Sequence, residues 1–295
     1  MCKSVEVSLA SVAVVIPVGR VDGILDEQVR RVLAQQCLTL CEVVLSMNTS
    51  VASDQAMART LVADLGDARL RLVDSSDSRG AAHARNVGFR ATAATHVAFC
   101  DADDLVHEDW LAPLVRGLDH HDAVSGHLVD VFPDGKTPSW HPAATPGGLP
   151  RFLGKPYLLS GNLAIRRSAF ESVGGFDETL TRCEDIALSW SLLRAGFAIG
   201  YVDDAIIDYR HRAGLGDMLH QHYLYGRGMT EVLRTHGIPS DSGWSTSRRS
   251  YLRLLRPNGQ RAPKRTVIGL LRRGAIGLGR ARGLLSPAAH GEGRS

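Results

Sequence analysis

Three carboxylates within four residues follow a short apolar stretch in the first half of the chain. Asp101, Asp103 and Asp104 come directly after the run from His96 to Cys100. Carboxylates this close together repel one another unless a cation compensates their charge. Their hard oxygen atoms suit Mg²⁺ or Mn²⁺ better than a metal that prefers sulfur. The turn therefore predicts a divalent metal site, with a polar cap for the next helix as the structural alternative.

A second pair of acids, Glu184 and Asp185, lies at the predicted start of a helix that ends before Gly196. The helix dipole and the free N–H groups of the first turn favour the ionised form of a carboxylate there. An ionised carboxylate beside an acceptor hydroxyl can take its proton as a general base. The pair therefore fits a general base at neutral pH, and ordinary helix N-terminal charges are the structural alternative.

The elements that position the acidic turn alternate between strands and helices. One helical period places Met57, Leu61, Val62 and Leu65 on a buried face. Near-continuous apolar strands joined by helices predict a parallel sheet with both faces covered and ligands beyond the carboxyl ends of its strands. The apolar runs of strand length are Val12 to Ile16, Glu42 to Leu45, Leu70 to Val73, and His96 to Cys100.

The second half of this region predicts a further block of helices and strands. The segment from Phe132 to Pro156 is rich in Pro and Gly, which favours irregular, mobile chain that closes over substrates. The predicted elements are a helix from Glu108 to Leu118, a strand from Ala123 to Val131, helices near Arg167 and from about Glu184 to Ala195, and strands from Phe197 to Val202 and Ala205 to Tyr209.

A series of motifs occurs in a fixed order along the chain. They are Ala84-Arg85-Asn86-Val87-Gly88, Phe99-Cys100-Asp101-Ala102-Asp103-Asp104, Gly161-Asn162-Leu163-Ala164-Ile165, Val173-Gly174-Gly175-Phe176-Asp177-Glu178 and Cys183-Glu184-Asp185. The series resembles the family 2 glycosyltransferases of the GT-A fold. The resemblance implies an α/β fold with a Rossmann-like, mostly parallel sheet flanked by helices. We expect a GT-A domain at 1–212, with a nucleotide-sugar half at 10–105 and an acceptor half at 106–212, followed by a helical basic extension at 213–295.

The resemblance implies a donor site around the acidic turn. Asp101 and Asp103 would hold the divalent cation, Mn²⁺ or Mg²⁺, that bridges the two phosphates of a nucleotide sugar, with Asp103 as the preferred direct ligand. His211 would be a third ligand. Arg85 would contact the diphosphate or nucleotide. On the acceptor side, Asp185 would act as the base.

Glu184 would orient the acceptor beside Asp185. The chain departs from the family pattern after the first two strands, where a Tyr-Asn pair and a base-recognising Asp are expected. Pro17, Asp22 and Asn48 are the candidate donor contacts that remain there. No Gln-x-x-Arg-Trp motif follows Asp185, which argues against a processive polymerase.

These features predict an inverting glycosyltransferase of the hexosyltransferase type that moves one sugar to an acceptor hydroxyl. The acceptor would be a saccharide, a lipid-linked molecule or a small molecule, in cell-surface polysaccharide, glycolipid or secondary-metabolite glycosylation. A nucleotidyltransferase is one alternative, although the stretch after the first strand is poor in glycine. A non-catalytic nucleotide-binding relative is the other, because the motif after the second strand is altered.

The C-terminal third is strongly basic. The segment from Arg248 to Arg282 contains eleven Lys or Arg residues and no Asp or Glu. It suggests peripheral contact with an anionic membrane, with Val267, Leu270, Leu271 and Leu278 in the interface, or a simple solvated face. No nucleic-acid partner is expected. The chain has no apolar run of spanning length and no signal-like apolar centre from Met1 to Ser11, so we expect a cytoplasmic protein.

Overall fold

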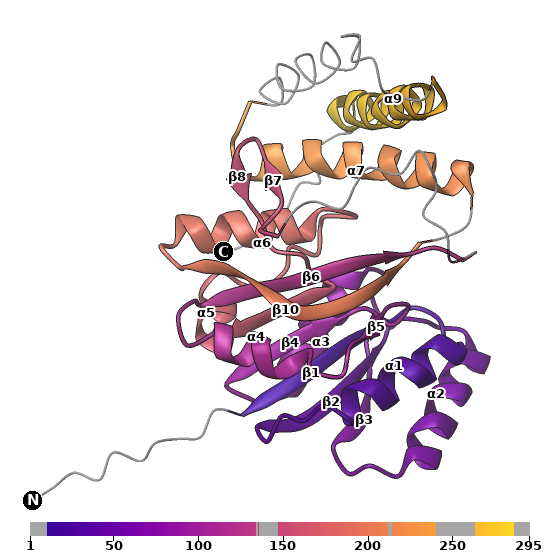
Figure 1. The fold of residues 1–295 in the computed structure, drawn as a ribbon, viewed down its shortest axis with the longest axis vertical. Helices are drawn as coiled ribbons and strands as arrows, with labels where there is room; N and C mark the ends of the chain where they lie inside the picture. Colours follow the sequence, from indigo (N-terminus) through magenta and orange to yellow (C-terminus); the bar gives the residue numbers. More distant parts are fainter. Residues whose placement is uncertain (1–10, 134, 136–146, 212–213, 240–262, 286–295) are drawn as a thin grey trace, which may run out of the picture.

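A mixed eight-stranded sheet forms the centre of the computed structural model (Figure 1). The structure describes residues 11–133, 135, 147–211, 214–239 and 263–285. The strands follow the order β3-β2-β1-β4-β9-β6-β10-β5. Parallel pairing joins four of the seven neighbouring strand pairs, so the prediction of a mostly parallel sheet flanked by helices is confirmed.

The first hundred residues fold as the predicted alternation of strands and helices. Strand β1 pairs in parallel with both β2 and β4, and its residues are almost all buried because helices cover both faces of the sheet. The elements are β1 (Val12–Val18), α1 (Gly23–Leu33), β2 (Leu40–Met47), α2 (Ala52–Leu65), β3 (Leu70–Asp74), α3 (Ala81–Ala91) and β4 (His96–Cys100).

Helix α2 is less buried than its pattern predicts. Met57 is 49% exposed, and Ala58 is the fully buried residue of this helix. Leu61, Val62 and Leu65 pack partly buried against the core, as predicted. The prediction for Met57 is wrong because α2 lies against the edge of the sheet near β3, where there is little core to cover.

The second half adds strands that run against the parallel set. Strand β9 lies between β4 and β6 and is antiparallel to both, and β5 pairs antiparallel with β10. The elements are β5 (Leu105–Val106), α4 (Leu111–Gly117), β6 (Ala123–Val131), β7 (Arg151–Phe152), β8 (Lys155–Pro156), β9 (Asn162–Arg166), α5 (Arg167–Ser172), α6 (Glu184–Arg194) and β10 (Ile199–Arg210).

Three local predictions for this half need correction. The two strands predicted between 197 and 209 are one strand, β10, whose register with β6 shifts between Val202 and Ile206. Helix α4 begins at Leu111, because the residues from Glu108 form a turn. The predicted irregular segment contains the hairpin of β7 and β8, and its residues 134 and 136–146 lie outside the described residues.

Two long helices, α7 (Leu215–Thr235) and α9 (Pro263–Leu285), confirm the predicted helical C-terminal part. Figure 1 shows α6, α7 and α9 stacked in successive layers on one side of the sheet. Trp190 of α6 shares a buried cluster with Val232 and Leu233 of α7, so α7 is part of the folded body. Among the described helices, none has the length and apolar character needed to cross a membrane.

Candidate active site

The acidic turn lies at the carboxyl end of β4, where parallel α/β sheets bind ligands. Oxygen atoms of Asp101, Asp103 and Asp104 lie within 4.8 Å of one another. Strand β5 follows the turn, and α4 begins later at Leu111 without a side-chain cap. The structural alternative of a helix cap is therefore wrong.

The three carboxylates fit a hard divalent cation. Asp103 is exposed, and Asp104 is buried with its Oδ1 accepting a hydrogen bond from the Arg210 N–H at 2.9 Å. Burial and the neighbouring charge of Asp101 raise the pKa of Asp104 to about 8. A Mg²⁺ or Mn²⁺ ion at this turn would relieve that repulsion, and an all-oxygen ligand set is the kind that both ions prefer.

A buried glutamine holds the backbone of the acidic turn. Gln28 of α1 donates from Nε2 to the Asp101 carbonyl at 3.0 Å and accepts from the Val106 N–H at 2.9 Å. It has no exposed surface. The sequence analysis did not include Gln28, although a polar residue beside Leu25 and Val29 on an otherwise apolar face is the signal that reveals it.

A glycine allows the close approach of a second segment to the turn. A Cβ atom added at Gly161 would lie 2.6 Å from Asp101 Oδ2. The next residue, Asn162, is buried and accepts a hydrogen bond from the Trp110 indole N–H at 2.8 Å, so the segment cannot move away easily.

The Gly161→Ala variant should therefore displace the Asp101 carboxylate and weaken binding of Mn²⁺ roughly tenfold, as perturbed metal sites commonly do. Isothermal titration of Mn²⁺ into the protein without donor measures this affinity. Gly23→Ala is the matched control, because a Cβ atom there would meet nothing within 4 Å. An unchanged affinity in Gly161→Ala would show that Asp101 does not hold the ion.

Arg85 joins the acidic turn to the second acid pair. Its Nη2 lies 2.6 Å from Asp101 Oδ1, and its Nη1 lies 2.9 Å from Glu184 Oε1. The Arg85 side chain is 3% exposed, so both ion pairs are made inside the protein. The sequence predicted a donor contact for Arg85. The structure places its guanidinium between Asp101 at the end of β4 and Glu184 at the start of α6.

Removing Arg85 should leave two carboxylates without their cation. We expect Arg85→Met to lower the free energy of unfolding by about 3 kcal/mol, near the lower end for broken buried pairs, because both carboxylates keep some contact with water. Urea unfolding measures the loss. Arg90→Met on the same helix is the control, since Arg90 is 61% exposed and its ion pair should contribute little. Equal stabilities of the two variants would contradict the bridging role of Arg85.

The other residues of the α3 motif fix the turn that precedes α6. Asn86 donates from Nδ2 to the Phe176 carbonyl at 2.8 Å and accepts from the Phe176 N–H at 3.0 Å. A Cβ atom at Gly88 would overlap Val15 of β1, so only glycine lets α3 pack this closely on the sheet. Asn86 and Gly88 therefore hold α3, which carries Arg85, against the segment at Phe176 and against β1.

Asp185 lies in the first turn of α6, directly after the Glu184 that Arg85 holds. Its Oδ1 accepts a hydrogen bond from the Ile186 N–H at 2.8 Å. Burial and the charge of Glu184 raise the pKa of Asp185 to about 7. From the helix N-terminus, the sequence predicted an acid that is kept ionised at neutral pH. The structure corrects this, because burial outweighs the helix N-terminus.

Three partly buried tyrosines lie near enough to the acid pair or the acidic turn for the charges of Asp185 and Asp104, besides burial, to raise their pKa values. Gln221 of α7 donates from Nε2 to the Tyr225 hydroxyl at 3.0 Å and to the Tyr209 hydroxyl at 3.2 Å. Burial and the charge of Asp185 raise the pKa of Tyr157, so its hydroxyl stays protonated. Sequence reasoning missed these residues, because no local pattern places α7 beside β10.

The residues after the first two strands that were predicted to contact the donor mostly make hydrogen bonds within the protein. Asp22 caps α1 by accepting hydrogen bonds from the Ile24 and Leu25 N–H groups. Asn48 donates to the Ser78 carbonyl at 2.7 Å and accepts from the Gly80 N–H at 2.9 Å, which fixes the loop before α3. Pro17 is partly buried on β1 opposite Ser46 of β2. Their contact with a donor stays a prediction.

His211 lies directly after β10, but it is not in the carboxylate cluster. Its Nε2 lies 2.7 Å from Asp130 Oδ1, and its ring stacks on Phe132 with 4.4 Å between centroids. The cluster among the described residues contains Asp104 in its place. Ligation by His211 stays a prediction that would require its ring to turn from Asp130.

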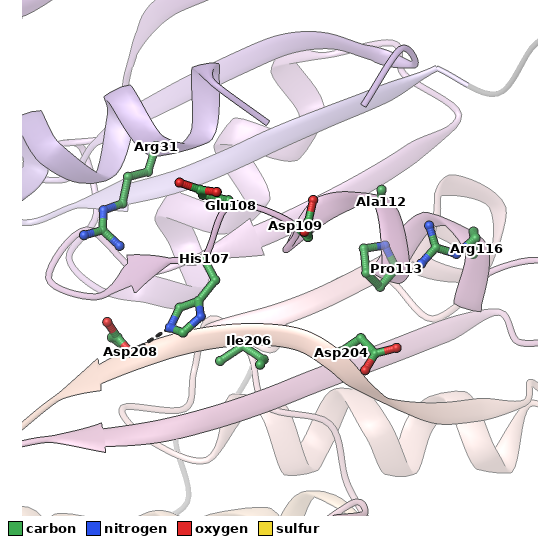
Figure 2. Close-up of a pocket in the computed structure, with 10 residues that line it drawn as sticks. All are labelled: Arg31, His107, Glu108, Asp109, Ala112, Pro113, Arg116, Asp204, Ile206 and Asp208. Atoms are coloured by element: carbon green, nitrogen blue, oxygen red, sulfur yellow. Dashed lines mark hydrogen bonds and ion pairs between the residues drawn. The ribbon is translucent and has the colours of Figure 1, made fainter. Parts of the chain in front are cut away.

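A separate pocket of about 780 Å³ lies beside α4 and β10 (Figure 2). In Figure 2, His107 points toward Asp208, and the atoms Nε2 and Oδ1 of the two residues are 2.8 Å apart. Acidic and basic side chains are mixed on its walls, and none of the predicted site residues lines it. The pocket is lined by Arg31, His107, Glu108, Asp109, Ala112, Pro113, Arg116, Asp204, Ile206 and Asp208.

Known proteins resemble this chain in both sequence and fold. A pre-mycofactocin glycosyltransferase of Mycobacterium tuberculosis is 32% identical over 171 residues, which are 54% of this chain and 36% of that protein. The match therefore spans about a third of the relative's length.

Two solved structures have the same fold. A mannosyltransferase from Pyrobaculum calidifontis in complex with GDP-Man and Mn²⁺ aligns with a TM-score of 0.65 at 15% identity, over 94% of this chain and 88% of that one. The structure of GalNAc-T7 with UDP, GalNAc and Mn²⁺ aligns with a TM-score of 0.57 at 16% identity, over 77% of this chain and 52% of that one.

Two family profiles match the chain itself. The profile of glycosyl transferase family 2 matches residues 13–174, which contain the α3 motif and the acidic turn. The profile of glycosyl transferase family group 2 matches residues 96–272, which contain Glu184 and Asp185. The chain belongs to the family 2 glycosyltransferases.

Proposed function

We propose that this protein is a metal-dependent, inverting glycosyltransferase that moves one sugar from a nucleotide-diphosphate sugar to an acceptor hydroxyl. The observation that carries the proposal is the position of Arg85, which holds Asp101 and Glu184 by one guanidinium. The acidic turn and the first turn of α6, which carries the candidate base Asp185, are thereby held together. Family membership and the Mn²⁺ complexes of two structural neighbours support the same assignment.

The donor side of the proposed site is the acidic turn. Asp101 and Asp103 would hold Mn²⁺ or Mg²⁺, with Asp103 as the exposed direct ligand and Asp104 beside it. The bound ion supplies charge stabilisation for the leaving diphosphate. Arg85 holds one oxygen of Asp101, and Gln28 holds its carbonyl, so the turn is preorganised for the donor.

The acceptor side is the first turn of α6. Asp185 accepts the proton of the acceptor hydroxyl as that oxygen attacks the sugar carbon, and the bond from this carbon to the diphosphate breaks. A pKa of about 7 suits this task, because the base is ionised in part at neutral pH and still holds a proton well. Glu184, held by Arg85, orients the acceptor. We expect the protonated hydroxyls of Tyr157 and Tyr225, whose pKa values burial and the charge of Asp185 raise, to hydrogen-bond a polyhydroxylated acceptor.

Nucleotide-sugar turnover tests the proposal. Each member of a panel of nucleotide sugars is incubated with the protein and Mn²⁺, and the released products are identified by chromatography. We expect slow release of a nucleoside diphosphate that EDTA stops. Formation of a nucleoside triphosphate and a sugar 1-phosphate when pyrophosphate is added would instead identify a nucleotidyltransferase. Absence of turnover with every donor, despite metal-dependent binding, would identify a non-catalytic relative.

A further inference from the structure

Among the described elements, α9 lies outermost on its side of the sheet (Figure 1), and it carries an apolar stripe. The stripe contains Val267, Leu271, Leu278 and Leu285, which are 55%, 45%, 69% and 76% exposed. Their spacings of four, seven and seven residues are close to whole helical turns, so the four side chains share one face about 27 Å long. Leu270, which the sequence placed in an interface, is partly buried and lies off the stripe.

The opposite face of α9 is fixed to α7. A Cβ atom at Gly279 would overlap the Tyr223 carbonyl, and a Cβ atom at Gly226 of α7 would overlap the Ile276 carbonyl. The two helix backbones therefore touch at glycines. Arg280 is buried, and its guanidinium lies 5.7 Å from the centroid of the Phe152 ring on β7. The stripe is thus carried by a helix that packs firmly on the folded body.

The two outer helices, α7 and α9, together carry a net positive charge. Helix α9 contains six Lys or Arg residues and no Asp or Glu. In α7, Asp217 and Glu231 balance Arg227 and Arg234, so the pair of helices keeps the positive charge of α9. A rigid helix with an apolar stripe and a positive field has the chemistry of an interfacial helix on an anionic lipid surface. A second copy of the chain fits less well, because two such helices would repel each other.

We infer that the protein docks on anionic membranes through the α9 stripe. The stripe buries its leucines at the level of the lipid headgroups, and the net positive charge of α9 attracts the anionic surface. Figure 1 shows that α6, which carries Asp185, lies on the same side of the sheet as α9, away from the β1–β3 half. Docking through α9 would bring the α6 side of the sheet closer to the lipid than the β1–β3 half, with α7 between α6 and α9. This orientation favours a lipid-linked acceptor, a consequence that rests on the proposed function.

Vesicle sedimentation tests the inference on the full chain. Vesicles of equal parts phosphatidylglycerol and phosphatidylcholine should pellet the protein, and vesicles of phosphatidylcholine alone should pellet at least about tenfold less. Leu271→Glu with Leu278→Glu should reduce binding about tenfold or more, because charge is placed in the stripe. Leu38→Glu is the matched control, since Leu38 is fully exposed and immediately precedes β2, a strand that Figure 1 shows at the opposite end of the fold from α9.

Several outcomes would overturn the inference. They are wild-type protein that stays in the supernatant, equal binding to both vesicle types, and stripe variants that pellet like the wild type. Concentration-dependent dimerisation that the variants abolish, without vesicle binding, would assign the stripe to a second copy. Unchanged thermal unfolding shows that the variants fold, and Leu278→Glu alone provides a milder second variant. Donor turnover is measured separately, so failure of docking leaves the proposed function standing.

Discussion

Asp103→Ala should abolish metal-dependent binding of the nucleotide sugar. Asp103 is the exposed carboxylate of the acidic turn, and its oxygen lies within 4.8 Å of those of Asp101 and Asp104. Loss of supporting residues around a bound metal costs about 10–100-fold in affinity, and we expect loss of a direct ligand to exceed about 100-fold. Calorimetric titration of the donor in the presence of Mn²⁺ measures the effect.

The control for Asp103→Ala is Asp109→Ala. Asp109 is also an exposed acid on the same connection from β4 to α4, but it lies in the separate pocket beside α4. Its removal changes the local charge equally and should leave donor binding unchanged. If both variants bound the donor as tightly as the wild type, the acidic turn would not be the donor site.

Asp185→Asn should lower sugar transfer about 10²–10⁴-fold while donor binding stays near the wild-type value, because the amide cannot take the acceptor proton. The wild type should lose activity as the pH falls through about 7, since protonation removes the base and a raised pKa places this loss near neutrality. Donor turnover with water as the acceptor, measured across this pH range for the wild type and Asp185→Asn, gives the loss of activity and its pH dependence. The residual activity of Asp185→Asn should lack this dependence.

Asp26→Asn is the matched control for Asp185→Asn, because Asp26 is an acid in the first turn of α1. It tests the alternative that Glu184 and Asp185 are ordinary helix N-terminal charges. A transfer rate in Asp185→Asn as high as that in Asp26→Asn would place the base elsewhere.

The sequence predicted those elements whose structure depends on residues nearby in the chain. Strand β4 has the predicted bounds, because an apolar run next to charged residues defines a buried strand locally. The acidic turn was predicted with it, because its charged residues mark the point where the apolar run ends. Strand β9 was not predicted as a strand, although its residues were recognised as a motif, because its place between β4 and β6 comes from distant pairing.

The links between the site residues depend on contacts that no local pattern encodes. Arg85 meets Glu184 across elements that are distant in the chain, and the neighbouring Asn86 bonds to Phe176 in the segment between α5 and α6. Gln221 reaches Tyr209 because α7 folds back on the sheet after β10. Burial also changed the chemistry of Asp185, since its pKa of about 7 reflects surroundings that the helix position alone does not reveal.

The central claim is that the acidic turn binds a nucleotide sugar through a divalent cation. The most direct measurement is titration of a panel of nucleotide sugars into the wild-type protein, with and without Mn²⁺. We predict that at least one nucleotide sugar binds in the presence of Mn²⁺ and that EDTA removes the binding. Donors that all fail to bind, or that bind equally well without the metal, would contradict the claim.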